Sequence, residues 1–191
     1  MDNSLADAAA VIRAGGIVAY PTEGVWGLGC DPASREAVER LIALKGRDVA
    51  KGLILIAAEE GQLAPWIEPF NPAMADRVRG TWPGPVTWIV PARPDCPAWL
   101  TGGRPTLAVR ITAHPPAREL CVAAGTALVS TSANVSGQAP LEGPEALHRA
   151  FGTALDAILD GPLGGLQGPT EIRDLQTGRI LRTGPAQSTS G

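Results

Sequence analysis

The chain has few cysteines and histidines, and they are too scattered to predict a metal site or a disulfide framework. The three cysteines, Cys30, Cys96 and Cys121, are odd in number and form no CxxC pair, and the two histidines, His114 and His148, lie far apart in the sequence. Zinc sites need closely spaced ligands, and disulfide-rich folds need paired cysteines. We therefore expect no structural metal, and we expect each cysteine to be a small buried hydrophobic residue.

Long apolar runs are also missing. No segment approaches the roughly 20 apolar residues of a membrane span, and the acidic, alanine-rich start MDNSLADAAA does not resemble a signal peptide. The apolar share of 45%, the formal net charge of −3 and the mean hydropathy of +0.07 are typical of an ordinary soluble globular protein. These features predict a cytoplasmic protein.

Several common catalytic and nucleotide-binding motifs are absent. Gly24, Gly27 and Gly29 do not have GxGxxG spacing, and no helix pattern follows them at the right distance. The sequence contains neither GxxxxGK[ST] nor GxSxG. A dinucleotide fingerprint, a P-loop and a nucleophile elbow are therefore excluded.

Helix and strand patterns alternate from end to end, without a linker or an internal repeat. Helices are expected over 5–13, 34–46, 71–80, 115–125 and 143–152. Strands are expected over 17–20, 52–58, 86–92, 106–112, 127–130, 157–160, 170–175 and 179–183, with a loop over 21–32 and a hairpin-like return over 99–105. The alternation predicts one α/β domain over 1–191, with a polar, frayed tail at about 185–191.

The lysines are concentrated in one segment. The sixteen cations divide into fourteen Arg and two Lys, and both lysines, Lys45 and Lys51, fall with Arg47 in KGRDVAK. The cluster has two interpretations. It is either a solvated helix end, because cations favour helix C-termini, or a site that binds an anion.

A second polar segment, LVSTSANVSG at 128–137, follows an apolar run with four hydroxyls and an amide: Ser130, Thr131, Ser132, Asn134 and Ser136. Small polar residues of this kind are common in strand-to-helix turns. The same residues at a strand end also form a polar cup of the kind that holds ligands in open α/β sheets.

Six blocks in order resemble the YrdC/TsaC-type threonylcarbamoyl-AMP synthases. They are GGIVAYPTEGVWGLGCDP (15–32), ALKGRDVAKGLILIA (43–57), WPGPVTWIVPA (82–92), LAVRIT (107–112), STSANVSG (130–137) and GPTEIRD (168–174). The resemblance implies a single YrdC-like α/β domain, with a twisted mixed sheet flanked by helices and a concave ligand cleft. It also implies a reaction that joins L-threonine, bicarbonate and magnesium-bound ATP into threonylcarbamoyl-AMP and releases pyrophosphate. Other proteins then use this product to build threonylcarbamoyladenosine in tRNA.

The resemblance also implies the site residues. The family's KxR and SxN tetrad corresponds to Lys45, Arg47, Ser132 and Asn134, which are expected to converge on ATP and the acyl-phosphate, with Lys45 and Arg47 on the cleft surface. Three further residues are expected at the threonine, namely Thr22, Trp26 as a wall, and Arg110 for the carboxylate. Three more are expected at the nucleotide, namely Thr87, Thr170 and Arg182. The alternatives are a strand-edge ion pair for Arg110 and turn or surface positions for Thr87, Thr170 and Arg182.

The chain departs from the family pattern at two places. Trp26 stands where many relatives have Tyr, which keeps an aromatic wall but removes a hydroxyl. Asp48 stands where many relatives have Pro after KxR, and a His that many carry near the next strand is missing. Lys51 is a candidate to replace that His.

Two other functions are weighed against the enzyme. One is a module of the same fold that binds double-stranded RNA or tRNA through a rim of Arg93, Arg104, Arg110 and Arg118, although the net charge of −3 weakens it. The other is a carbamoyl-transfer domain of the hydrogenase-maturation type. Such chains are long and carry zinc-type cysteine clusters, and this sequence has neither feature.

Overall fold

The fold is that of a computed structural model, which describes residues 4–134 and 137–185. Apart from Pro185, the tail that was expected to fray lies outside the described residues. Ser136 of the hydroxyl-rich segment also lies outside them. Within the described ranges, no helix is both long and apolar enough to cross a bilayer.

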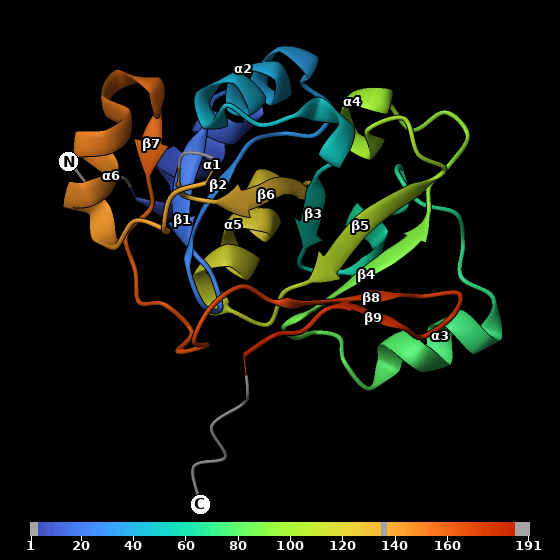
Figure 1. Cartoon of the computed structure of the whole chain (residues 1–191). Coiled ribbons are helices and arrows are strands. Elements are labelled where there is room, and N and C mark those ends of the chain that lie inside the picture. Colours follow the sequence, from blue (N-terminus) through green and yellow to red (C-terminus); the bar gives the residue numbers. More distant parts are fainter. Residues whose placement is uncertain (1–3, 135–136, 186–191) are drawn as a thin grey trace, which may run out of the picture.

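The described strands form a nine-stranded sheet in the order β7-β1-β2-β6-β3-β5-β4-β8-β9 (Figure 1). The pairs β7–β1, β3–β5 and β4–β8 are parallel and the others are antiparallel, which confirms the predicted mixed sheet. The strands are β1 (Val18–Pro21), β2 (Trp26–Gly29), β3 (Ile54–Ala57), β4 (Val86–Pro91), β5 (Thr106–Ile111), β6 (Leu128–Ser132), β7 (Ala157–Ile158), β8 (Glu171–Asp174) and β9 (Ile180–Arg182).

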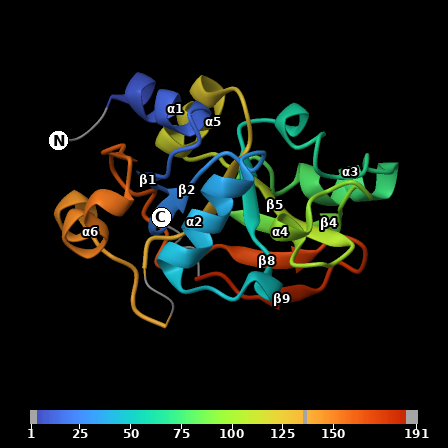
Figure 2. The same cartoon turned by 90° about the horizontal axis from the view of Figure 1, so that it is seen from above.

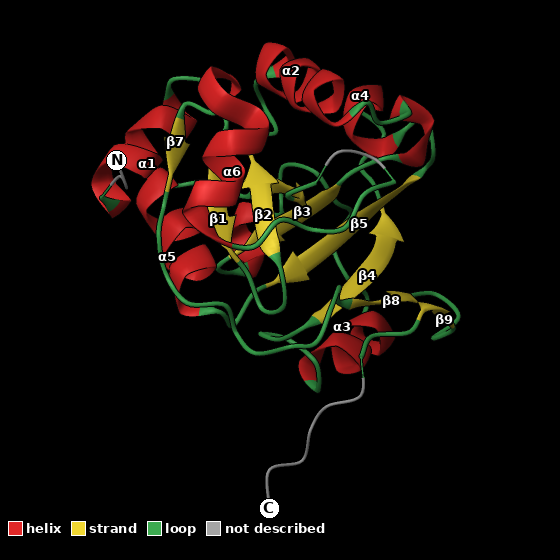
Figure 3. Ribbon diagram, turned by 60° about the vertical axis from the view of Figure 1, so that its left-hand side comes forward, coloured by secondary structure: helices red, strands yellow, loops and turns green. Residues whose placement is uncertain are grey.

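Helices cover both faces of this sheet (Figures 2 and 3). The helices α1 (Leu5–Arg13) and α5 (Pro115–Ala124) pack on one face. The other face packs against α2 (Arg35–Lys45), α3 (Pro72–Arg79), α4 (Ala98–Thr101) and α6 (Gly143–Phe151). The short 3-10 helices are η1 (Val49–Lys51), η2 (Glu60–Gln62) and η3 (Gly152–Ala154). Each face of the sheet therefore has its own apolar core.

The two-residue period of the strands decides which side chains enter which core. On β5, Leu107, Val109 and Ile111 are buried in the core under α2 and α4. Ala108 and Arg110 alternate with them and line a cavity on the opposite face. The same alternation on β4 turns Trp88 and Val90 toward the core. The strand pattern therefore places Arg110 where a ligand can approach it.

One expectation about the backbone is wrong. Residues 21–32 were expected to be a loop, but Trp26–Gly29 form β2, which pairs with both β1 and β6. Gly29 is required by close approach, because a Cβ there would lie 2.5 Å from the carbonyl oxygen of Val129. The glycines of β2 weaken the strand signal in the sequence, but the missing side chain lets β1 and β6 pack closely against β2.

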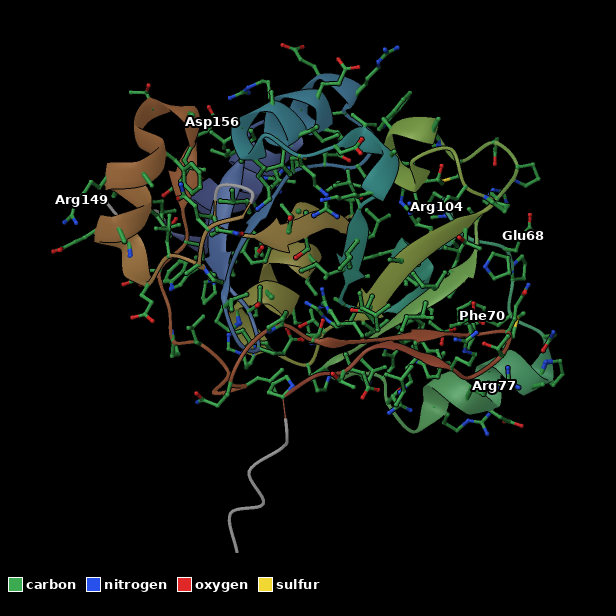
Figure 4. The ribbon with its side chains drawn as sticks, viewed as in Figure 1. Glu68, Phe70, Arg77, Arg104, Arg149 and Asp156 are labelled. Atoms are coloured by element: carbon green, nitrogen blue, oxygen red, sulfur yellow. The ribbon has the colours of Figure 1, made fainter. Side chains whose placement is uncertain are left out.

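The hairpin-like return at 99–105 is only partly as expected. β4 and β5 are antiparallel, but the connection between them contains the short helix α4. At the far edge of the sheet, the Arg77 guanidinium on α3 donates to the carbonyls of Leu175 and Gln176 in the turn between β8 and β9 (Figure 4). This contact attaches the edge strands to the body of the sheet.

Candidate active site

The structure brings the KxR and SxN motifs together. The helix α2 has Ser34 at its N-cap, as the sequence predicts, and ends at Lys45. The Lys45 ammonium reaches the end of β6, where it donates to the carbonyl oxygens of Ser132 and, at 2.8 Å, Asn134. It also donates to Oδ1 of Asn134 at 3.1 Å, and this oxygen accepts a 2.5 Å hydrogen bond from the Ser132 hydroxyl. Two segments almost ninety residues apart thus form one polar cluster.

Lys45 is not on the cleft surface, which corrects the sequence expectation. Its side chain is only 3% exposed, and three oxygens use its three donors. Burial, and to a smaller extent the nearby positive charge of Arg47, lower the pKa of Lys45 to about 8. Lys45 therefore holds the end of β6 in place and contributes positive charge from beneath the cavity.

Beside this cluster lies a cavity of about 220 Å³ on the face of the sheet that α1 and α5 cover elsewhere. Four cationic side chains line it: Arg47, Lys51, Arg110 and Arg182. Hydroxyls surround them, and the polar lining also includes Thr22, Ser130, Thr131, Ser132 and Thr170. Among the described residues, no Asp or Glu lines this cavity.

The concentration of positive charge affects the arginines themselves. Burial lowers the pKa of Arg47 and of Arg182, and the charges of Arg110 and Arg47 lower that of Arg182 further. Arg47 donates from Nη2 to the carbonyl of Gly52 at 2.9 Å, whereas its buried Nε has no partner. Since the whole chain carries a net charge of −3, the cavity is a local positive region built to attract an anion.

Arg110 lies in a buried network that sequence reasoning missed. Its Nη2 forms a 3.1 Å ion pair with Glu23, and its Nη1 donates to the hydroxyls of Thr87 and Thr170 at 3.3 and 3.1 Å. The ion pair is not at a strand edge, because β5 lies between β3 and β4. Glu23 belongs to the PTE of the first block, and the single carboxylate between the apolar segments 17–20 and 25–30 was the available signal.

The remaining expected residues occupy three different environments. Thr22 lines the cavity and donates to the carbonyl of Val25 at 2.6 Å. Arg182 on β9 is exposed as a residue, but its guanidinium is part-buried at the cavity, where Nε and Nη2 donate to the Thr170 carbonyl at 3.1 and 2.7 Å. Thr87 is fully buried behind Arg110 and is not a turn or surface residue.

Trp26 does not line the cationic cavity. It is 4% exposed and lines a neighbouring cavity of about 520 Å³, together with Leu141, Leu163 and Leu166. The two cavities share Gly24, Val25 and Gly168 in their walls. The aromatic wall expected beside the amino acid thus belongs to an adjoining space, which no Lys or Arg among the described residues lines.

Three of the four arginines considered for an RNA rim, namely Arg93, Arg104 and Arg110, have partners within the fold. Arg110 is 4% exposed and points to the cavity network. Arg93 is paired with Asp95 at 3.0 Å, and Arg104, which Figure 4 labels near the start of β5, donates to the carbonyls of Ala50 and Lys51. No group of three or more His, Cys, Asp or Glu side chains gathers as metal ligands within residues 4–134 and 137–185.

The fold and the site together indicate an α/β protein that binds phosphate or carboxylate groups in a cationic cleft, beside which two distant sequence motifs meet. The family model Sua5/YciO/YrdC, whose description reads "Telomere recombination", matches residues 10–184. The chain belongs to this family.

Similar proteins agree with this assignment. The chain is 56% identical over 175 residues to the threonylcarbamoyl-AMP synthase of Halorhodospira halophila, covering 92% of each chain. It is 54% identical to that of Nitrosococcus oceani, covering 92% of this chain and 95% of the relative. P. abyssi Sua5, whose crystal structure was solved with L-threonine, has a TM-score of 0.87 and 31% identity. The match covers 94% of this chain and 54% of Sua5, so the chain spans about half the length of Sua5. E. coli YciO has a TM-score of 0.80 and 28% identity, with 96% and 92% covered.

Proposed function

We propose that the protein is a threonylcarbamoyl-AMP synthase that forms threonylcarbamoyl-AMP and pyrophosphate from L-threonine, bicarbonate and ATP. The observation that carries the proposal is the meeting of Lys45 with Ser132 and Asn134 beside a cavity lined by four cations. The names of the close relatives support the same activity. The product is proposed to serve the modification of tRNA to threonylcarbamoyladenosine by other proteins.

The chemistry needs no protein nucleophile. The threonine amine and bicarbonate give a carbamate and water. An oxygen of the carbamate then attacks the α-phosphorus of ATP, and the bond from that phosphorus to the bridging oxygen breaks, which releases pyrophosphate. Such a transfer depends on positioning and on neutralising phosphate charge. Cations and hydroxyls are the residue types that supply both.

The residues divide between the two substrates. Arg47, Lys51 and Arg182 line the cavity and have no carboxylate partner within residues 4–134 and 137–185, and they are proposed to bind the phosphates. Ser132 is proposed to hold a phosphate or the carbamate, with Lys45 and Asn134 fixing its position. Arg110 is proposed to bind the carboxylate of threonine, next to Thr22.

Thr87 and Thr170 are proposed to support Arg110 rather than to touch the nucleotide directly. Magnesium is proposed to enter on the triphosphate, as part of the substrate. All of these residues lie on or beside the one sheet, so we propose that a single domain carries the whole reaction. We propose a cytoplasmic location separately, because the relatives of this chain are named threonylcarbamoyl-AMP synthases and their product serves tRNA modification.

The test is a pyrophosphate-release assay with magnesium-ATP, bicarbonate and L-threonine, in which each substrate is omitted in turn. We expect release only when all three are present, together with a product of the mass of threonylcarbamoyl-AMP. Release that does not depend on threonine, or no release at all, would contradict the proposed function.

A further inference from the structure

Glu23 is a buried carboxylate next to the cavity that does not line it. It is 7% exposed, and its two oxygens face different partners. Oε2 accepts from Nη2 of Arg110 at 3.1 Å, and Oε1 accepts from the Thr112 hydroxyl at 2.7 Å. Glu23 therefore lies behind Arg110 and acts on the cavity only through it.

The backbone of Glu23 is held as firmly as its carboxylate. Its carbonyl accepts a 2.8 Å hydrogen bond from the amide of Leu166. The preceding carbonyl, of Thr22, accepts from the amide of Gly164 at 3.0 Å. The segment 161–169 thus fixes the residue from one side, while Thr112 on the chain after β5 fixes it from the other. A carboxylate anchored in this way can set the orientation of the side chain that it pairs with.

The guanidinium of Arg110 is correspondingly constrained. Nη1 donates to two threonine hydroxyls and Nη2 donates to Glu23, so acceptors on both terminal nitrogens fix the plane of the group. Nε of Arg110 is buried and has no partner. A buried donor without an acceptor is unfavourable, and it is satisfied when a ligand oxygen reaches it after a small adjustment of the site.

The ion pair also divides the cavity electrostatically. Arg110 is paired with Glu23, so this pair adds no net charge to its end of the cavity, although Arg182 lies close by on the carbonyl of Thr170, whose hydroxyl Arg110 binds. Arg47 and Lys51 have no carboxylate partner among the described residues, so their end of the cavity is the more positive one. A zwitterionic amino acid suits the first end, and a triphosphate suits the second.

We propose that Glu23 is a positioning and specificity-determining residue: it orients Arg110 toward the carboxylate of the amino acid and keeps phosphate groups out of that end of the cavity. The inference rests on the proposed function, because it names how the two anionic substrates are sorted within the same site.

The first test is Glu23→Gln, which keeps the shape of the side chain and removes its charge. We expect the KM for threonine to rise about 10- to 100-fold, the range for losing a charged hydrogen bond, while the KM for ATP stays within about twofold. Tripolyphosphate should become a competitive inhibitor against threonine in this variant but not in the wild type. A residue that only stabilises the fold would not produce that competition.

A second pair of variants covers the case in which Glu23→Gln does not fold, since removing one partner of a buried ion pair is strongly destabilising. Thr112→Val removes the hydroxyl on Oε1 and keeps both charges, and Thr112→Ser keeps the hydroxyl. We expect the KM for threonine to rise several-fold in Thr112→Val and to recover in Thr112→Ser. Glu39→Gln, in an exposed ion pair with Arg35, is the control and should change neither KM.

Calorimetric titration of L-threonine separates this inference from the proposed function. If the wild type binds and uses threonine but folded Glu23→Gln keeps the wild-type KM, the inference is wrong and the function stands. If Glu23→Gln does not fold and Thr112→Val has an unchanged KM for threonine, the inference is also wrong. If the wild type neither binds threonine nor uses it, both are wrong.

Discussion

The cationic residues of the site differ in how many of their hydrogen-bond donors are already bonded within the fold. All three donors of Lys45 are occupied by oxygens at the end of β6. Lys51 also lines the cavity, but its ammonium makes no hydrogen bond to any of the residues described. The two lysines of the chain therefore have distinct roles: one holds a loop in place, and the other is available to a ligand.

The buried position of Lys45 predicts an alkaline loss of activity. Its pKa of about 8 means that its charge is lost as the pH rises through 8. We expect kcat/KM for ATP, which reports the free enzyme, to fall with an apparent pKa near 8. In Lys45→Arg the residual activity should not fall there. Stability changes in the opposite direction. Between pH 8 and 10.5 Lys45 is protonated in the unfolded state but mostly neutral in the folded state, so its contribution to the free energy of unfolding rises with pH over that window. An activity profile that is flat to pH 10 would contradict the assignment.

Lys51 offers a cleaner test of phosphate binding. Lys51→Met removes the charge and disrupts no hydrogen bond of the described fold, so we expect the Tm to be unchanged. The kcat/KM for ATP should fall about tenfold or more, as for the loss of one charged contact to phosphate, while the KM for threonine should change little. Lys51→Arg is the matched control and should recover part of the loss. Equal effects on both substrates would place Lys51 outside the phosphate end.

Among the structural elements, the turn at 22–25 and the segment 161–169 form a unit that connects the two cavities. The amides of Gly164 and Leu166 donate to the carbonyls of Thr22 and Glu23. This contact leaves no room beside Gly24, where a Cβ would lie 2.2 Å from the carbonyl oxygen of Gly168. The close packing of the two segments that hold Thr22 and Glu23 therefore requires glycine at position 24.

Gly24→Ala should separate these two segments. Because the added methyl group meets backbone atoms that cannot rotate away, we expect a loss of about 1–3 kcal/mol in the free energy of unfolding and a raised KM for threonine. Denaturant titration and steady-state kinetics measure the two effects. Gly80→Ala, where a Cβ would meet nothing within 4 Å, is the control. Wild-type stability in Gly24→Ala would show that the two segments are not tightly packed.

For the whole molecule, the two cores on either side of the sheet determine which thiols can react. Cys30 belongs to the core under α2, Cys121 belongs to the core under α1 and α5, and both are fully buried. Burial raises the pKa of each to about 12. The third cysteine, Cys96, is half-buried at the edge of the first core.

A thiol titration therefore measures the integrity of both cores. At pH 8 we expect one thiol, that of Cys96, to react with Ellman's reagent in the native protein, though more slowly than a free thiol because burial and the charge of Asp95 raise its pKa, and three to react after unfolding in guanidinium. Cys96→Ser should remove the native reaction. The slow reaction of the other two should follow global opening of the fold. Two rapidly reacting thiols in the native protein would mean that one core is open.

The architecture was largely predictable, because it follows from local patterns. Ser34 begins α2 and the helix ends at Lys45, and the apolar run at 52–58 contains β3. The alternation along 106–112 separates Arg110 from the core residues beside it. β2 was missed because its two glycines give no strand signal, and pairing with β1 and β6 overrides that weak propensity.

Of the residues expected at the site, Thr22, Arg47, Arg110, Ser132, Thr170 and Arg182 line the cavity, whereas Lys45, Thr87 and Trp26 do not. By itself the sequence determined the α/β class, because periodicity and capping are written in neighbouring positions, while the mixed sheet and the residues of the cluster were implied by the resemblance of its ordered motifs to a known family. Only the tertiary structure decided that Lys45 lies buried beneath Ser132, that Trp26 faces the adjoining cavity, and that Glu23 neutralises Arg110 across 87 residues of chain. The physical reason is that burial and ion pairing depend on which distant segments the sheet order brings together, and no local pattern contains that order.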